Sequence, residues 1–292
     1  MNISRLALVT ALGLGLSSTG CLGNTDPLVE DIEPPRFKTL EDPGGGIKPN
    51  GLTPAAFHSN KHKLRAAMEV RLAPQGSLQV STEILATGLL GTEEGRTTFR
   101  YAVACALPTN TTLLTAGILD ENNNPGMYPG AELLTTTGSW LTDGLPENAR
   151  RDLWTCMIAH LNPFGEPVEV LLSGGSVKDQ SDSQPDQVNF TFDEAVWSVI
   201  MPTFPSGLPS FHVWPMPDLA SECPLRIVGA LQTRFCSGYG GFDGCDLDVR
   251  SNLGADCTEA LGHYTCFAGP AIRTRLESTS VSKLYNGCAP IP

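Results

Sequence analysis

Apolar residues recur at helical spacing in three segments of the chain. In the segment 147–161 they form one stripe, and Pro146 stands at its start and Pro163 beyond its end. Proline is tolerated in the first turn of a helix but stops a helix that runs into it. Similar stripes run through 97–106 and, more weakly, through 57–70. The pattern therefore predicts three helices.

Strand-like segments lie mostly after these helices. Five segments are short and apolar, and parts of two of them alternate polar with apolar positions as a half-buried strand does. The five are 78–85, 168–172, 188–192, 225–234 and 271–277. The polar segment 174–186 and the segment 202–217, with its five prolines, are predicted to be irregular. This order predicts an α+β fold, with an N-terminal helical part, an antiparallel β-sheet and a disulfide-rich C-terminal module.

The composition excludes several classes of protein. Of the 292 residues 41% are hydrophobic, enough for a packed core and too many for a disordered chain. The apolar runs are shorter than the roughly 18 to 20 residues that a membrane-spanning helix needs. The formal net charge of −12 repels phosphate backbones, so we expect no nucleic-acid partner. A coiled coil, a fibrous protein and a multispan membrane protein are excluded, but no function is named.

The first residues have the features of an export signal. Arg5 is the only charged residue in 1–20, the segment 6–16 is apolar, and Gly20 precedes Cys21. This arrangement resembles the signal of bacterial lipoproteins, which ends in a lipobox. The resemblance implies that 1–20 is a signal peptide and that Cys21 becomes the acylated first residue, so that lipid holds the protein to a membrane. The alternative is an ordinary secretory signal cut near the same place.

Composition suggests two further boundaries. The segment 21–56 has six prolines, three consecutive glycines and twice as many acidic as basic residues. Such a segment is predicted to be an extended tether that holds the folded part away from the membrane. The rest is predicted to form an α+β body over 57–222 and a cystine-rich β module over 223–292, or one continuous domain.

The nine cysteines divide into one and eight. If Cys21 carries lipid, eight remain, and an even number in an exported chain predicts four disulfides. One pair joins two predicted helices, two pairs enclose glycine-containing turns, and one closes the C-terminal module. In that order they are Cys105–Cys156, Cys236–Cys245, Cys257–Cys266 and Cys223–Cys288. We expect no zinc site, because the close cysteine pairs typical of zinc sites do not occur, and no cofactor.

The candidate metal ligands match no known motif. His58 and His62 would share a helix face, but no glutamate follows the first histidine, and we expect both on a solvated surface. Asp243, Asp246 and Asp248 are weak calcium candidates, since their spacing matches no EF-hand loop and a turn of the cystine module is favoured there. No metal site is therefore predicted.

No motif of a nucleophilic enzyme occurs in the sequence. The serines and glycines of 173–176 do not form G-x-S-x-G, because Lys178 takes the place of the last glycine. His160, His212 and His263 are the available bases, and nothing in the sequence ties one of them to a serine. No catalytic residue is predicted, and a non-enzymatic protein is favoured over an enzyme.

Aromatic residues offer a candidate binding surface. Trp214 lies among prolines with Phe211 nearby, and we expect it to be exposed. Trp154 and Trp197 are expected to be buried. The segment 193–197 would place a carboxylate beside an aromatic ring, an arrangement found in carbohydrate sites.

The export signal and the cysteines together predict a lipoprotein of the bacterial cell envelope with a structural or binding role. Its expected partners are the membrane, through the N-terminal lipid, and an unidentified protein or glycan. Its expected location is the outer membrane or the cell surface, or the periplasm or medium if no lipid is attached. One alternative function is a secreted hydrolase that acts on envelope glycan or peptide. A third is a calcium-dependent ligand-binding module.

Overall fold

Residues 51–119, 125–164, 168, 170–178, 189–202, 207–238, 246–267, 269–285 and 288 are described by the computed structural model of the chain. The predicted signal peptide 1–20, Cys21 and most of the predicted tether lie outside the described residues. None of the helices within the described ranges is both long enough and apolar enough to cross a membrane.

Three long helices form where the spacing of apolar residues predicts them. They are α1 (Pro54–Met68), α3 (Glu93–Ala106) and α4 (Glu147–Ala159). The first two begin earlier than predicted, because Thr53 and Thr92 cap them. Each threonine side chain accepts a hydrogen bond from the backbone N–H three residues ahead. These caps satisfy backbone donors that would otherwise have no partner inside the helix.

Shorter helices lie between two of the long helices, between strands and after the last strand. They are α2 (Thr82–Ala86), α5 (Pro217–Glu222), α6 (Ile227–Cys236), α7 (Leu253–Asp256) and α8 (Ser278–Leu284), with 3₁₀ turns at Leu89–Gly91 and Gly138–Leu141. The strand predicted over 225–234 is wrong, since α6 covers most of it. Ile227, Leu231 and Phe235 recur every four residues, and the last two are fully buried. This helical period outweighs the strand preference of the β-branched residues.

The strand predicted over 78–85 is also wrong. Gln79 makes only an isolated bridge to Leu114, and α2 begins at Thr82. The Ser81 hydroxyl accepts a hydrogen bond from the backbone N–H of Ile84 and caps this helix.

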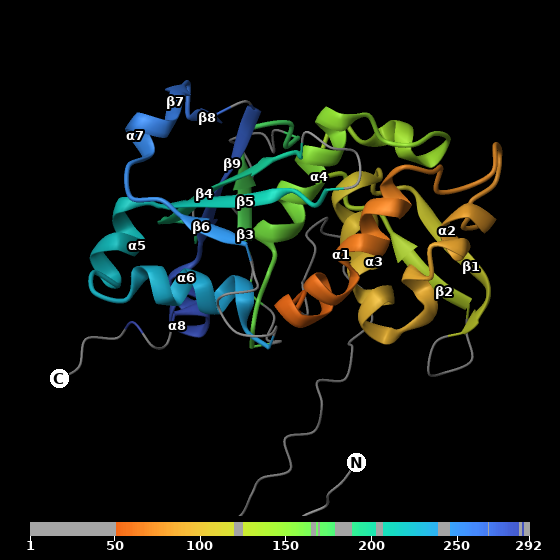
Figure 1. Cartoon of the computed structure of the whole chain (residues 1–292), viewed down its shortest axis with the longest axis horizontal. Helices are drawn as coiled ribbons and strands as arrows, with labels where there is room; N and C mark the ends of the chain where they lie inside the picture. Colours follow the sequence, from red (N-terminus) through yellow and green to blue (C-terminus); the bar gives the residue numbers. More distant parts are fainter. Residues whose placement is uncertain are drawn as a thin grey trace, which may run out of the picture. The chain divides into compact units, whose positions relative to one another are not determined.

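Seven strands of the described chain form one sheet, in the order β6-β5-β4-β9-β8-β7, and β3 also pairs with β9 (Figure 1). They are β3 (Val170–Ser173), β4 (Phe192–Ile200), β5 (Ser210–Pro215), β6 (Leu247–Val249), β7 (Cys257–Ala260), β8 (His263–Cys266) and β9 (Gly269–Leu276). The pair β5–β6 is parallel and the other pairs are antiparallel. A separate antiparallel hairpin joins β1 (Thr112–Leu119) and β2 (Pro125–Pro129). The predicted α+β class is confirmed, and β3 and β9 lie within two residues of predicted strands.

Two central strands depart from the sequence prediction. The strand predicted over 188–192 begins only at Phe192, as β4. β5 lies inside the proline-rich segment 202–217, so the prediction of irregular structure is wrong there. Pro209 precedes this strand and Pro215 ends it. Proline is compatible with strand ends, where few ladder hydrogen bonds are lost.

The sheet buries side chains on both of its faces. On the helical side Phe211 of β5 and Trp154 of α4 both contact Phe57 of α1, with ring centroids 5.9 and 5.7 Å from that of Phe57. On the other side Trp214 and Val196 pack beneath α7 and the β7–β8 hairpin. Neighbouring strand residues point to opposite faces, which is why Phe211 and Trp214 enter different cores. Figure 1 shows α4 between the sheet and the pair α1 and α3.

The folded body begins before residue 57. Leu52 is fully buried and bridges to Leu161, and α1 already starts at Pro54. The predicted end of the tether at residue 56 is therefore too late. The predicted parts 57–222 and 223–292 share one sheet and one core, since β4 of the first part pairs with β9 of the second.

Three of the four predicted disulfides are confirmed. Cys105–Cys156 joins α3 to α4. Cys257–Cys266 closes the β7–β8 hairpin, and Cys223–Cys288 joins the end of α5 to the chain beyond α8. Each bridge restricts the unfolded chain, and such restriction commonly stabilises a fold by about 2–4 kcal/mol.

The fourth pair, Cys236–Cys245, stays a prediction. Cys236 is buried at the end of α6 and is disulfide-bonded, and Cys245 lies outside the described residues. We expect non-reducing peptide mapping of the oxidised protein to recover a peptide that links Cys236 to Cys245. A free thiol at either position, or a cross-link from Cys236 to another cysteine, would contradict the pairing.

Candidate functional site

A serine, a histidine and an aspartate form a line of hydrogen bonds on β5 and β6. Ser210 and His212 are two residues apart on β5, so their side chains lie on the same face of the sheet. Asp248 of β6 is the register partner of His212. Ser210 Oγ lies 3.3 Å from His212 Nε2, and His212 Nδ1 lies 3.2 Å from Asp248 Oδ2. These positions combine the residue types of a nucleophile, a base and an orienting acid.

The carboxylate of Asp248 determines the tautomer of His212. A carboxylate oxygen only accepts hydrogen bonds, so Nδ1 of the ring carries the proton and donates it. In the neutral ring Nε2 then has a free electron pair and accepts the hydroxyl proton of Ser210. Burial lowers the pKa of His212, against the opposite influence of Asp248. The ring is therefore neutral at neutral pH, as a general base must be.

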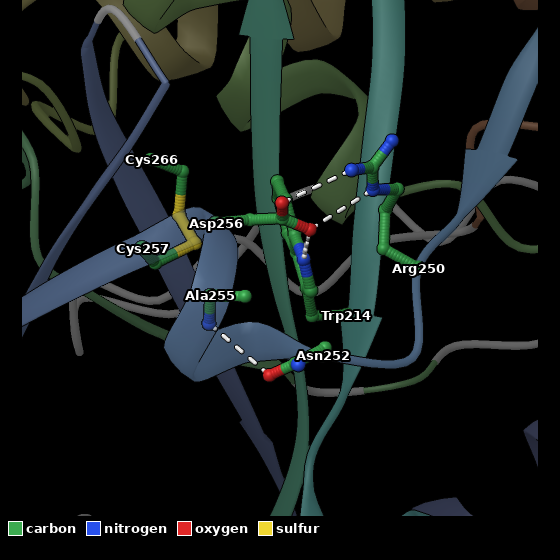
Figure 2. Close-up of a disulfide and its surroundings, with 7 residues drawn as sticks. All are labelled: Trp214, Arg250, Asn252, Ala255, Asp256, Cys257 and Cys266. Carbon is green, nitrogen blue, oxygen red and sulfur yellow. Dashed lines mark hydrogen bonds and ion pairs between the residues drawn. A yellow bond between two sulfur atoms is a disulfide. The ribbon is translucent and has the colours of Figure 1, made fainter.

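Arg250, which follows β6, holds two aspartates in place. Its Nη1 donates to Asp248 Oδ2 at 3.0 Å, and its Nε and Nη2 donate to the two oxygens of Asp256, each at 3.0 Å. The indole Nε1 of Trp214 also donates to Asp256, at 3.0 Å (Figure 2). Hydrogen bonds from Arg250 and Trp214 hold the pKa of Asp256 below its usual value. This network ties β5 and β6 to the end of α7.

A helix cap and a disulfide hold the chain next to this network. Figure 2 shows α7 capped by Asn252, whose side chain accepts a hydrogen bond from the backbone N–H of Ala255, and the adjoining Cys257–Cys266 disulfide. Phe267, just after this hairpin, is 44% exposed. Its ring centroid lies 5.2 Å from that of His212, and the Arg250 guanidinium carbon lies 5.2 Å from the same ring. An exposed aromatic ring thus borders His212.

A second polar cluster lies deep in the core, on the helical side of the sheet. Arg234 of α6 forms an ion pair with Glu194 of β4, and the two side chains are 1% and 0% exposed. Arg234 also donates to Tyr285 Oη at 3.1 Å, and the Tyr285 hydroxyl donates to Glu194. Burial raises the pKa of Tyr285 to about 12, so its hydroxyl keeps the proton that it donates.

A β-bulge places Glu194 in this cluster. Asp193 and Ala195 pair with consecutive residues of β9, so Glu194 is the extra residue between them. A bulge redirects a side chain relative to the regular alternation of a strand. Arg234 is held further by the backbone carbonyls of Leu161 and Ala159, at 3.0 and 2.7 Å. Because the charged groups have almost no exposed surface, this cluster offers no surface to a substrate.

The two predicted binding aromatics are buried. Trp214 and Phe211 are both 0% exposed, so the expectation of an exposed aromatic surface is wrong. The prolines near them bound a regular strand, and strand alternation directs each ring into one of the two cores. Trp154 and Trp197 are buried, as predicted.

The histidines of α1 differ in their environments. His62 is exposed, as predicted, but His58 is 2% exposed, and the prediction of a solvated surface is wrong for it. Its Nε2 lies 2.8 Å from the backbone oxygen of Phe235, and burial lowers its pKa to about 4. His160 is buried after α4, with its Nδ1 2.8 Å from the Cys156 carbonyl oxygen and its pKa also lowered by burial to about 4.

The weak calcium candidates face cations. Asp246 lies 3.6 Å from the Lys61 ammonium, Asp248 accepts from Arg250, and Asp243 lies outside the described residues. The metal-like cluster found in the described part of the chain consists of His160 with Cys105 and Cys156. Those two cysteines form a disulfide and have no thiolate to offer.

The other candidate carboxylates and serines are also occupied. Asp193 forms an ion pair with Arg273, and Glu194 is buried with Arg234, so neither carboxylate is available to a glycan. The Ser176 hydroxyl donates a hydrogen bond to the Asp152 carboxylate at 2.7 Å, and the hydrogen bonds of its side chain in the described chain include none to a histidine.

A small cavity of about 10 Å³ lies away from the Ser210–His212–Asp248 line. Its lining includes Gly51, His160, Arg234 and Leu284, and its volume is near that of a single water. No protein-family model, curated protein or solved structure matches the chain.

The sequence indicates His212 as an available base but neither of its two partners. Ser210 and His212 are two residues apart, which places them on one face only if they lie in a strand. The prolines around them argued against a strand. Asp248 is 36 residues further along the chain, and only the parallel pairing of β5 with β6 brings it to His212.

Proposed function

We propose that the chain is an exported lipoprotein of the bacterial cell envelope, with a disulfide-stabilised body and an acylated Cys21. The observation that carries the proposal is the oxidised state of the body, in which Cys105, Cys156 and four further cysteines pair with one another. Disulfides of this kind persist in exported proteins and are rare in the cytosol. The cysteine at position 21 follows a segment that resembles a lipoprotein signal.

In this proposal the lipid holds the body at the outer membrane or the cell surface, through the proline-rich segment that follows Cys21. Several acyl chains anchor a protein stably, since each buried CH₂ contributes about 0.8 kcal/mol. The body has a structural or binding role toward a protein or glycan, and its net charge disfavours nucleic acid. Without the acylation, the same chain would be periplasmic or secreted.

A hydrolase acting on envelope glycan or peptide is the second candidate function. One observation favours it, the contact of His212 with both Ser210 and Asp248. The calcium-dependent module has no comparable support, since Asp246 and Asp248 both face basic side chains.

Metabolic labelling tests the anchor. We expect a bacterial host that expresses the full chain to incorporate labelled palmitate into the protein and to retain it in the membrane fraction. The Cys21→Ala variant should lose the label completely, because no thiol remains for the diacylglycerol group.

The matched control is Ser17→Ala, which alters the same segment and leaves the cysteine in place. It should be labelled like the unaltered chain. A soluble, unlabelled mature protein with its own Cys21 would overturn the lipoprotein proposal and leave the ordinary secretory signal.

A further inference from the structure

The line Ser210–His212–Asp248 has the arrangement of a serine-hydrolase site. We propose that Ser210 is an acylatable nucleophile, with His212 as its general base and Asp248 as the positioning residue, and that the substrate is an ester group carried on an envelope glycan or peptide. The inference rests on the second candidate function, the hydrolase, and is independent of the lipid anchor.

The exposure of the three residues fits these roles. Ser210 is exposed at the start of β5, so a substrate can reach its hydroxyl. His212 is 8% exposed and lies inside the sheet, between β4 and β6. Asp248 is half exposed at the edge strand, 3.2 Å from the far nitrogen of the imidazole. A reachable nucleophile beside a fixed base is the arrangement that acyl transfer requires.

Several contacts fix the imidazole. Asp248 holds its Nδ1, and Arg250 holds the same carboxylate at 3.0 Å. The rings of Trp214 and Phe267 lie beside it, with centroids 6.2 and 5.2 Å from that of His212. These contacts keep Nε2 directed toward Ser210 without substrate, and such preorganisation is what a base needs to act at a defined atom.

The reaction proceeds in two steps, acylation of Ser210 and hydrolysis of the acyl-serine. Ser210 Oγ attacks the ester carbonyl carbon while His212 Nε2 accepts the hydroxyl proton. The bond from that carbon to the alcohol oxygen then breaks, the proton passes from His212 to the departing alcohol, and an acyl-serine remains. In the second step a water oxygen bonds to the acyl carbon while His212 accepts one water proton. The bond from that carbon to Ser210 Oγ then breaks, His212 returns the proton to Oγ, and the acid leaves.

The leaving group favours an ester over an amide as the substrate. The partly exposed Phe267 offers an apolar surface beside His212. An ester has a better leaving group than an amide, so its cleavage demands less stabilisation of the tetrahedral intermediate from the site.

Labelling with a biotinylated fluorophosphonate tests the proposal on the mature, oxidised protein. In this probe reaction the serine oxygen bonds to phosphorus, and fluoride leaves with the serine proton. We expect one label per chain, located on the Ser210 peptide by mass spectrometry, and hydrolysis of p-nitrophenyl acetate at a rate above that of buffer.

Matched variants separate the roles. Ser210→Ala should abolish labelling, whereas Ser251→Ala, at an exposed serine three residues from Asp248, should leave it unchanged. His212→Gln should slow labelling about 10²-fold or more, because the general base is lost. Thermal melting should show that the Ser210→Ala and Ser251→Ala variants remain folded, since both side chains are exposed.

The variant Asp248→Asn tests the positioning role of Asp248 through the pH dependence of labelling, which the loss of a purely structural contact would not change. The Asp248 charge raises the pKa of His212, so its removal should shift the pH midpoint of labelling downward. Arg250, which lowers this pKa, and Asp256, which raises it, are unchanged in the variant.

Equal labelling of the unaltered chain and Ser210→Ala, or no labelling of Ser210 at all, would overturn the proposal. If Ser210 is unlabelled but the mature protein still degrades envelope glycan or peptide, the inference fails and the hydrolase function stands. If both are absent, both fail.

Discussion

Replacement of Arg234 by methionine should lower the free energy of unfolding by about 3–5 kcal/mol. The substitution leaves the Glu194 carboxylate in the core without its cation, and an unpaired buried charge costs about that much. It also removes the donors to the Leu161 and Ala159 carbonyls, at 3.0 and 2.7 Å. Urea unfolding of the mature, oxidised protein measures the effect, provided that the slope of stability against urea is unchanged.

A second substitution shows whether charge is the cause. Glu194→Gln in the Arg234→Met background removes the uncompensated charge and keeps an oxygen that can accept from Tyr285. The double variant should recover about half of the loss or more. Arg71→Met is the matched control, since it breaks an exposed ion pair with Glu83 at 3.1 Å and should cost less than about 1 kcal/mol. A loss in Arg234→Met as small as in Arg71→Met would contradict the structural role of the buried cluster.

Acid should destabilise the protein well above the range in which most carboxylates titrate. His58 and His160 have pKa values lowered by burial to about 4, whereas a histidine in the unfolded chain titrates near 6.5. Between these values the unfolded chain binds protons that the folded chain does not. The contribution of these two histidines to stability therefore falls as the pH drops from about 6.5 to 4 and is constant above that window. By pH 4.5 each histidine should remove about 2.5 kcal/mol.

The slope of stability against pH isolates the two histidines. The variant His58→Gln/His160→Gln should have a shallower slope between pH 7 and 4.5, whatever its stability at pH 7. His62→Gln, at the exposed histidine of the same helix, should leave the slope unchanged. The prediction fails if the double variant loses as much stability on acidification as the unaltered protein does.

The three long helices could be predicted from the sequence because a helix depends on residues that lie only a few positions apart in the chain. The helix α4 follows from its apolar stripe and its flanking prolines, and α1 and α3 follow from similar stripes. The even number of cysteines, together with the positions of predicted helices and turns, was enough to pair Cys105–Cys156 and two further bridges.

Other elements depended on contacts that lie far apart in the sequence. The segment 225–234 looks like a strand by composition, but packing of Leu231 and Phe235 into the core makes it helical. β5 forms within a proline-rich segment because β4 and β6 supply hydrogen-bonding partners on both sides. Tertiary pairing thus outweighs local preference at these positions.

By itself, the sequence determined the α+β class, the three long helices and three of the four predicted disulfides, since these follow from periodicity, flanking prolines and cysteine spacing. Only the tertiary structure decided what the polar residues do. The bulge at Glu194 brings it to Arg234, 40 positions away in the chain, and the pairing of β6 with β5 brings Asp248 to His212. Charged and catalytic side chains carry no periodic signal, and the register between distant strands decides which of them meet.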